Sequence, residues 1–197
     1  MSNKQESKLN ESNIFDAEHI EILESKNRQK WQNPKEIMKQ LKLKPSQVVA
    51  DVGCGSGYFT VPISRKVKKI YAIDIQQEML DHLEKKIRML NIKNIEPLLS
   101  KDNKIPLQDE SVDLLLSVNT LHEFKDKENI INEMRRIIKH NGRAVIVDFT
   151  KENAEIGPPI AIRVSEDQAI NLFEKQGLTV LKTHDLPNHY LFVLQKN

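Results

Sequence analysis

Short apolar runs alternate with amphipathic stretches from Gln47 onward. Five runs bounded by polar or turn residues predict strands at 47–52, 69–74, 94–99, 112–118 and 142–149. Two of the intervening stretches carry an apolar stripe with helical spacing, one over 79–90 and one over 130–138. Short buried strands that alternate with helices form parallel sheets covered on both faces, so the pattern predicts an α/β fold.

The C-terminal part of the chain predicts one more helix and two more strands. Asn141-Gly142 is expected to end the helix that carries the 130–138 stripe. Ser165 with Gln168 fits a capping box that opens the last helix, and Gly177 is expected to close it. The runs 178–184 and 189–195 follow, joined by the short link 185–188, which permits antiparallel pairing.

A helical extension is expected before the first strand. Phe15 and Ile20 flank Asp16 at the spacing of a hydrophobic staple, and Asn33-Pro34 fits a capped helix start. The polar opening has no apolar signal-peptide core. We therefore divide the chain into a disordered leader, a helical extension and the main domain, at 1–13, 14–44 and 45–197.

Composition narrows the functional classes. The 30 Lys and Arg residues against 28 Asp and Glu give a net charge of +2, too balanced to predict binding to nucleic acid or a membrane from charge alone. The apolar runs are too short for a membrane anchor, so we expect a cytoplasmic protein. The single cysteine, Cys54, cannot close an intrachain disulfide or supply a thiolate metal cluster, and we predict no metal site.

A glycine-rich turn carries the strongest chemical signal. In VVADVGCGSGYFT, residues 48–60, a predicted strand runs into Gly53, Gly55 and Gly57 and then into a helix. Such a turn lets backbone approach a ligand and aims amide groups and a helix N-terminus at it. The alternative is a tight strand-to-helix connection that holds no ligand.

Asp74 is the second signal, because it ends the next predicted strand. A right-handed crossover places this strand end beside the glycine turn. A carboxylate there can accept hydrogen bonds from both hydroxyls of a ribose. The alternative is that Asp74 only caps the following helix, since Gln77 and Glu78 lie at capping distance.

The glycine spacing separates two nucleoside cofactors. The dinucleotide fingerprint G-x-G-x-x-G would require glycine at Tyr58, which disfavours a nicotinamide oxidoreductase. The spacing G-x-G-x-G preceded by Asp51 resembles the class I S-adenosylmethionine-dependent methyltransferases, from about Gln32 to the C-terminus. The segment FDAEHIEILESKNRQKWQNP resembles the leader of a small subgroup related to the ubiquinone and menaquinone methyltransferases.

This resemblance implies a Rossmann-like sheet of seven strands, mostly parallel with an antiparallel C-terminal strand, with helices on both faces. It implies S-adenosyl-L-methionine as the cofactor. In that family Asp51 would hold the methionine amino group, Gly53, Gly55 and Gly57 would form the floor beneath the methionine part, Asp74 would bind the ribose and Ile75 would pack on the adenine.

Two further regions are assigned by the same resemblance. Asp102 and Asn103 would contact the adenine edge, although many relatives would align an acid at Lys101 and Asp102 also fits a plain loop acid. Asn119 would make a backbone contact to the methionine part. His122 and Glu123 would face the acceptor, where either can take a proton as the acceptor is methylated; both also fit a structural role.

The expected function is methyl transfer to a small-molecule acceptor, with a non-catalytic cofactor sensor as the alternative. Arg28 and Arg163 are candidates to pair with an acidic acceptor, although lone arginines usually form surface ion pairs. The basic clusters 65–69 and 135–139 lie at predicted helix ends, where they complement the helix dipole. They lack interleaved aromatic residues, so we do not expect a nucleic-acid partner. The oligomeric state is left open.

Overall fold

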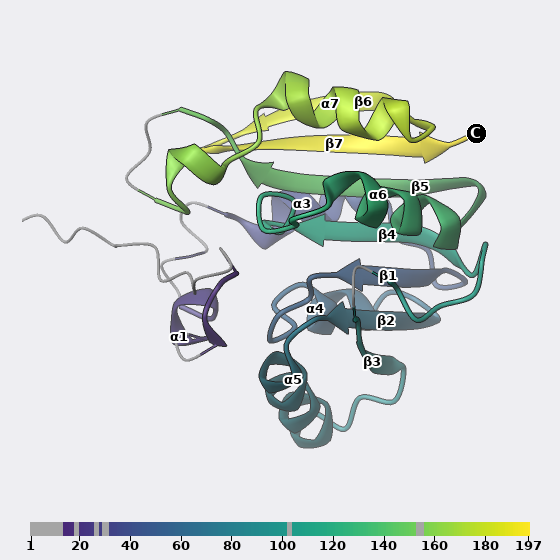
Figure 1. The fold of residues 1–197 in the computed structure, drawn as a ribbon. Helices are drawn as coiled ribbons and strands as arrows, with labels where there is room; N and C mark the ends of the chain where they lie inside the picture. Colours follow the sequence, from purple (N-terminus) through teal and green to yellow (C-terminus); the bar gives the residue numbers. More distant parts are fainter. Residues whose placement is uncertain (1–13, 18–19, 26–27, 29–31, 102–103, 153–155) are drawn as a thin grey trace, which may run out of the picture.

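A seven-stranded sheet forms the centre of the computed structural model, in the order β3-β2-β1-β4-β5-β7-β6 (Figure 1). The structure describes residues 14–17, 20–25, 28, 32–101, 104–152 and 156–197. The strands are β1 (Val48–Val52), β2 (Lys69–Asp74), β3 (Ile95–Leu99), β4 (Val112–Val118), β5 (Ile138–Phe149), β6 (Leu178–Leu186) and β7 (His189–Lys196). The predicted α/β class and seven-stranded sheet are confirmed.

β7 alone reverses the direction of the sheet. Strands β3, β2, β1, β4 and β5 pair in parallel, whereas β7 pairs antiparallel with both β5 and β6. The link between β6 and β7 shrinks to Pro187 and Asn188, and Asn188 takes a φ of 60° that closes the turn. The antiparallel pairing expected from the short link is confirmed.

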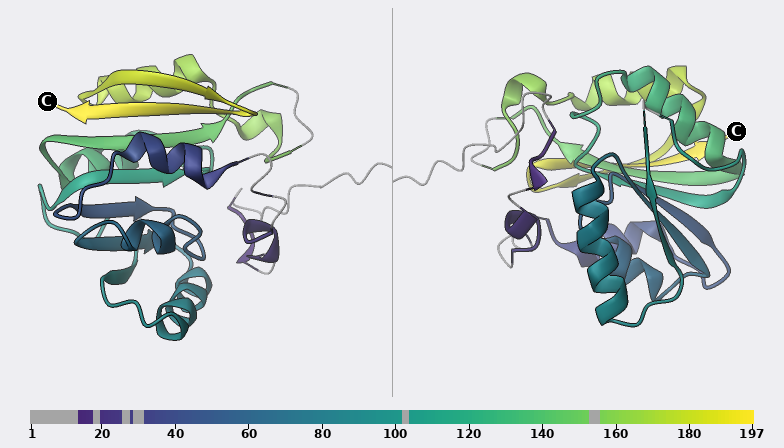
Figure 2. Two further views of the ribbon diagram at one scale, coloured as in Figure 1. Left: turned by 180° about the vertical axis from the view of Figure 1, so that it is seen from behind. Right: turned by 60° about the horizontal axis from the view of Figure 1, so that its bottom comes forward.

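Helices cover both faces of the sheet (Figures 1 and 2). On one face α3 (Pro34–Leu41), α4 (Thr60–Ser64) and α5 (Gln77–Met89) bury Ile37, Ile63 and Leu83 against β1, β4 and β5. On the other face α6 (Lys127–Ile137) and α7 (Glu166–Lys175) bury Ile131, Met134 and Phe173. Cys54 and Leu121, in the turns after β1 and β4, are also buried in these two cores.

Helix α6 ends earlier than the sequence predicts. Ile138 leaves the helix and pairs with Val112, while Arg143 pairs with Leu114, so the residues between them bulge out of β5. Asn141 takes a φ of 60° within this bulge. The prediction that Asn141-Gly142 ends the helix is wrong. Ile138 is buried as the first residue of β5, and its apolar side chain would fit the last turn of a helix equally well.

The N-terminal region contains α1 (Ile20–Leu23) and α3 among the described residues. Asn33 caps α3, since its side chain accepts a hydrogen bond from Lys35 N at 3.0 Å, and Pro34 occupies the first helical position. Residues 1–13, assigned to a leader, lie outside the described residues, and the division at residue 44 stays a prediction. Within the described ranges no helix is both long and apolar enough to cross a membrane.

The capping box of α7 is confirmed and gives a test of the local structure. Ser165 Oγ accepts from Gln168 N, and Gln168 Oε1 accepts from Ser165 N. We expect Ser165→Ala to lower the free energy of unfolding by about 1 kcal/mol, because it removes one of the two reciprocal bonds. Urea denaturation measures this; Ser46→Ala, at an exposed position, is the control, and equal stability of both variants would contradict the cap.

Candidate functional site

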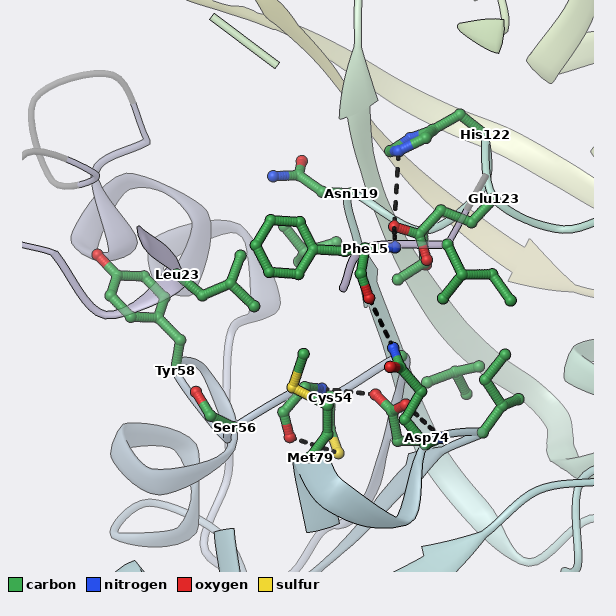
Figure 3. A pocket seen from close by; sticks show the side chains of 18 of the residues that line it. Phe15, Leu23, Cys54, Ser56, Tyr58, Asp74, Met79, Asn119, His122 and Glu123 are labelled. Atoms are coloured by element: carbon green, nitrogen blue, oxygen red, sulfur yellow. Dashed lines mark hydrogen bonds and ion pairs between the residues drawn. The ribbon is translucent and has the colours of Figure 1, made fainter. Parts of the chain in front are cut away.

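A cavity opens at the carboxyl ends of β1, β2, β4 and β5 (Figure 3). Its walls come from the turns that follow these strands and from the N-terminal segment. They include Asp51–Ser56, Asp74–Gln76, Asn119, Thr120, His122–Phe124, Phe149, Phe15, Leu23 and Arg28. In an α/β sheet, ligands bind at this edge, so its position marks it as the candidate site.

The glycine turn is fixed to the end of β2 by its own backbone. Gly53 N and Cys54 N both donate to Ile73 O, at 2.8 and 3.0 Å. Gly55 N donates to Asp74 Oδ2 at 2.8 Å. The turn therefore lies beside Asp74, as the crossover argument predicts.

The three positions of the turn require glycine for different physical reasons. An added Cβ at Gly53 would lie 2.1 Å from Thr120 Cγ2, and one at Gly57 would lie 2.5 Å from Leu83 Cδ1. These two glycines permit close packing inside the protein as well as positive φ angles. At Gly55 the nearest atom is Leu23 Cδ1 at 3.7 Å, so this glycine faces the cavity. Gly53 also lines the cavity, whereas Gly57 packs beneath the turn.

The two carboxylate oxygens of Asp74 accept hydrogen bonds from two backbone amides. Oδ2 accepts from Gly55 N, and Oδ1 accepts from Gln76 N at 3.0 Å. Burial raises the pKa of Asp74 in spite of these bonds, which act in the opposite direction. Gln76, not Asp74, is the N-cap residue of α5, so the simple capping alternative does not describe this carboxylate.

The other residues assigned to the nucleoside lie at the same edge or outside the described part. Ile75 lines the cavity and is 46% exposed, which leaves an apolar surface beside Asp74. Asp102 and Asn103 lie outside the described residues. Asn119 lines the cavity with a φ of 59°, and its N–H donates to Val147 O. A backbone contact from Asn119 would therefore use its carbonyl group.

Asp51 lies at the end of the cavity next to α4. Its Oδ2 accepts a hydrogen bond from Thr60 Oγ1 at 2.6 Å. Burial raises the pKa of Asp51 to about 7, and the nearby charge of Asp74 acts in the same direction. A ligand cation beside Asp51 would favour its ionised form.

His122 is held by a second carboxylate, from Asp148 on β5. His122 Nδ1 lies 2.7 Å from Asp148 Oδ1, and His122 N donates to Asp148 Oδ2 at 3.1 Å. A carboxylate only accepts, so Nδ1 carries a proton and Nε2 is directed toward Glu123, 3.8 Å away. Burial lowers the pKa of His122, but the charge and hydrogen bond of Asp148 outweigh it and hold this pKa above its usual value.

Glu123 joins this pair at the cavity wall. Burial raises the pKa of Glu123 to about 7, whereas His122 and a hydrogen bond from Phe15 N act in the opposite direction. Asp148, His122 and Glu123 thus form a row of three neighbouring groups. Glu123 titrates near neutral pH and lies beside His122, and the carboxylate of Asp148 favours the charged form of His122. This row can hold or accept a proton at the edge of the cavity.

Several residues in or next to the cavity escape the sequence analysis. Asp148 lies 26 positions from His122, and its only signal is a carboxylate that directly follows the apolar run 144–147. Phe15 is not a simple staple: its N–H donates to Glu123 Oε1 and its carbonyl accepts from Gln76 Nε2, so it bridges two walls (Figure 3). Leu23 also points into the cavity.

The two arginines considered for an acidic acceptor are buried, not surface ion pairs. Arg163 donates to the carbonyls of Pro158, Thr150, Glu152 and Ile156, so it organises the loop after β5. Arg28 contacts the ring of Tyr58 and lines the cavity.

Three residues of the basic clusters form ion pairs with acids. Lys69 pairs with Glu96, Arg136 with Glu133 and Asp109, and Lys139 with Asp113. These contacts give Lys69, Arg136 and Lys139 a structural role. Among the described residues, His, Cys, Asp and Glu side chains form no group of three that could hold a metal ion.

Comparison with known proteins identifies the family. The model of a methyltransferase domain matches residues 50–146. A SAM-dependent methyltransferase from Aquifex aeolicus has a similar structure, with a TM-score of 0.87 and 31% identity over 93% of this chain and 100% of that chain. This chain belongs to the class I S-adenosylmethionine-dependent methyltransferases. The resemblance seen in its glycine turn is therefore confirmed, and S-adenosyl-L-methionine is the cofactor of the family.

Curated relatives in the family match over part of their length. A methyltransferase-like protein of Schizosaccharomyces pombe is 35% identical over 109 residues, 55% of this chain and 40% of that protein. A demethylmenaquinone methyltransferase of Lactobacillus johnsonii is 29% identical over 121 residues, 59% of this chain and 50% of that protein. The matched region thus spans about half the length of these relatives or less.

The residues of the cavity fit S-adenosyl-L-methionine. Gly55 leaves open space where any side chain would intrude, Asp74 presents a carboxylate suited to vicinal hydroxyls, and Ile75 offers an exposed apolar side chain beside it. A sulfonium cofactor with a nucleoside at one end requires such a polar and apolar combination.

Gly53 and Gly55 form a matched pair for testing the turn. Gly53→Ala is expected to lower the free energy of unfolding by about 3 kcal/mol, from a strained φ and the overlap with Thr120. Gly55→Ala, with the φ strain alone, is expected to cost about 1 kcal/mol. Thermal and urea unfolding measure both.

The overlap at Gly53 has an internal control. Thr120→Ser removes the methyl group that an alanine Cβ would meet, so the double variant with Gly53→Ala should recover about 1 kcal/mol. Strict additivity of the two substitutions would show that Thr120 does not explain the glycine.

Proposed function

We propose that this chain transfers the methyl group of S-adenosyl-L-methionine to a small-molecule acceptor in the cavity. One observation carries the proposal: a single cavity joins Asp74 at one wall to the line His122 and Glu123 at another. When bound, the cofactor supplies an electrophilic methyl group on a sulfonium.

The cofactor end of the cavity would bind through Asp51, Gly53, Gly55, Asp74, Ile75 and Asn119, with Asp102 and Asn103 proposed for the adenine edge. Asp74 would accept hydrogen bonds from the ribose hydroxyls with the lone pairs that Gly55 N and Gln76 N leave available. Gly57 would act through the turn, because it packs on Leu83 of α5.

Glu123 would accept the proton that an acceptor hydroxyl or amine loses on methylation. Its pKa of about 7, raised by burial, matches a general base at neutral pH. Asp148 would hold His122 in place, and the charge of His122 would stabilise the ionised form of Glu123. Most of the remaining acceleration would come from aligning donor and acceptor atoms, which requires no further reacting side chain.

The cover of the cavity favours a small acceptor. Phe15 bridges Glu123 and Gln76, Glu24 forms an ion pair with Lys86 of α5, and Gly157 and Pro158 line the cavity from the other side. This cover would exclude water from the reacting atoms and leave little room for a folded macromolecule.

Transfer is tested by incubating the chain with S-adenosyl-L-methionine that carries a labelled methyl group and with a pool of small metabolites. We expect label in a small product. Reproducible cofactor binding without transferred label in any fraction would contradict the proposal and favour the non-catalytic sensor.

Asp74→Asn tests the cofactor end. We expect the dissociation constant for S-adenosylhomocysteine to rise about tenfold or more, because the variant loses the charge in its contacts to ribose. Calorimetric titration measures this dissociation constant. Asp81→Asn, at an exposed helix position, is the matched control. An unchanged dissociation constant with an intact fold would remove Asp74 from the site.

Glu123→Gln tests the proton acceptor. The base must be ionised, so kcat/KM of the unmodified chain should rise with pH through about 7, the pKa that burial gives Glu123. The variant should lose this limb and about 100-fold in kcat, while its affinity for S-adenosylhomocysteine stays within about threefold. Glu128→Gln on the exposed side of α6 is the control, and a retained limb in Glu123→Gln would contradict the assignment.

A further inference from the structure

Arg28 is a buried cation in the cavity wall. Arg28 is 6% exposed and lines the same cavity as Asp51. Its polar partners are neutral: Nε donates to Gln32 Oε1 at 2.9 Å and Nη1 donates to Leu23 O at 3.0 Å. Its guanidinium also lies over the ring of Tyr58, 4.2 Å from the centroid. Within the described ranges no carboxylate lies at ion-pair distance from it.

Within the described residues the charge of this guanidinium is compensated only in part, by the nearby Asp51. Burial of a cation without an opposite charge is costly, and neutral hydrogen bonds offset only part of that cost. Burial lowers the pKa of Arg28 to about 10, and the charge of Asp51 opposes the shift. An anion that entered the cavity would remove the imbalance and would bind to a preformed donor group.

The location of Arg28 relative to Asp74 indicates which anion. Tyr58, on which Arg28 stacks, lies on the opposite side of the glycine turn from Asp74 (Figure 3). Asp51 lies close enough to affect the pKa of Arg28. A carboxylate and a guanidinium that face one end of a cavity match the ammonium and carboxylate groups of an α-amino acid.

We propose that Arg28 binds the α-carboxylate of S-adenosyl-L-methionine. With the ribose at Asp74, the amino-acid end of the cofactor reaches across the glycine turn toward Arg28 and Asp51. The proposal rests on the proposed cofactor site and adds a residue from the N-terminal region, outside the glycine motif. Because Arg28 also donates a hydrogen bond to Leu23 O, cofactor binding and the position of α1 are coupled.

Two other roles would give different results. As a purely structural residue, Arg28 would tie Leu23 to Gln32, and its loss would affect every ligand of the cavity alike. As a partner of an acidic acceptor, it would not affect cofactor binding in the absence of acceptor. Ligands that differ only in the amino-acid part of the cofactor separate the three roles.

The experiment is calorimetric titration of the unmodified chain, Arg28→Gln and Arg65→Gln without acceptor. The probes are S-adenosylhomocysteine, decarboxylated S-adenosylhomocysteine, which lacks only the carboxylate, and 5'-methylthioadenosine, which lacks the whole amino-acid part. Arg65 is an exposed arginine at the end of α4 and serves as the matched control.

We expect Arg28→Gln to weaken S-adenosylhomocysteine binding by about 30-fold or more and the other two ligands by less than about threefold. Arg65→Gln should change none of them. Equal weakening of all three ligands, or no weakening of any, would overturn the proposal. If the unmodified chain binds none of the three ligands, the proposed function itself fails.

Arg28→Lys keeps the test decisive if Arg28→Gln does not fold. Lysine retains the charge but not the planar fork, so the preference for S-adenosylhomocysteine over decarboxylated S-adenosylhomocysteine should fall about fivefold. A preference within twofold of the unmodified chain, in whichever variant folds, contradicts carboxylate binding by Arg28.

Discussion

The attachment of the glycine turn to the end of β2 is the constraint on which the site depends. Ile73 O accepts hydrogen bonds from two amides of the turn, and Asp74 Oδ2 accepts a hydrogen bond from a third. These bonds fix the position of the Asp74 carboxylate and of the open side of Gly55 at once. Gly53 and Gly57 permit the same attachment from below, because Thr120 and Leu83 occupy the space of their missing side chains.

Buried charge is concentrated around this attachment. Asp51, Asp74 and Glu123 all have a pKa raised by burial, while Arg28 has a pKa lowered by it. Asp148 and His122 instead compensate each other directly. A cavity wall with several incompletely compensated charges is less stable than an apolar wall and better suited to a charged ligand, a common feature of functional sites.

The sequence predicted the strands well because each is a short apolar run between polar residues, and parallel strands buried on both faces must have this pattern. It predicted the glycine turn and Asp74 together because a crossover brings consecutive strand ends side by side. It failed at Ile138, since an apolar residue fits the last turn of α6 and the first pair of β5 equally well. Periodicity does not decide between them.

Contacts across the sheet were beyond the sequence. The pairing of His122 with Asp148 depends on the neighbouring positions of β4 and β5, and the bridge from Phe15 to Glu123 joins residues 108 positions apart. The burial of Arg28 and Arg163 likewise depends on carbonyls and rings that only the folded chain brings together. From sequence alone, lone arginines are expected at the surface. The hydrogen bonds of Arg28 and Arg163 to main-chain carbonyls instead hold both side chains in the interior.

The most direct measurement is a crystal structure of the chain with S-adenosylhomocysteine. The account predicts both ribose hydroxyls at roughly 2.6–3.0 Å from the carboxylate oxygens of Asp74, with the thioether above Gly55. A nucleoside bound elsewhere, or a ribose that makes no contact with Asp74, would contradict it.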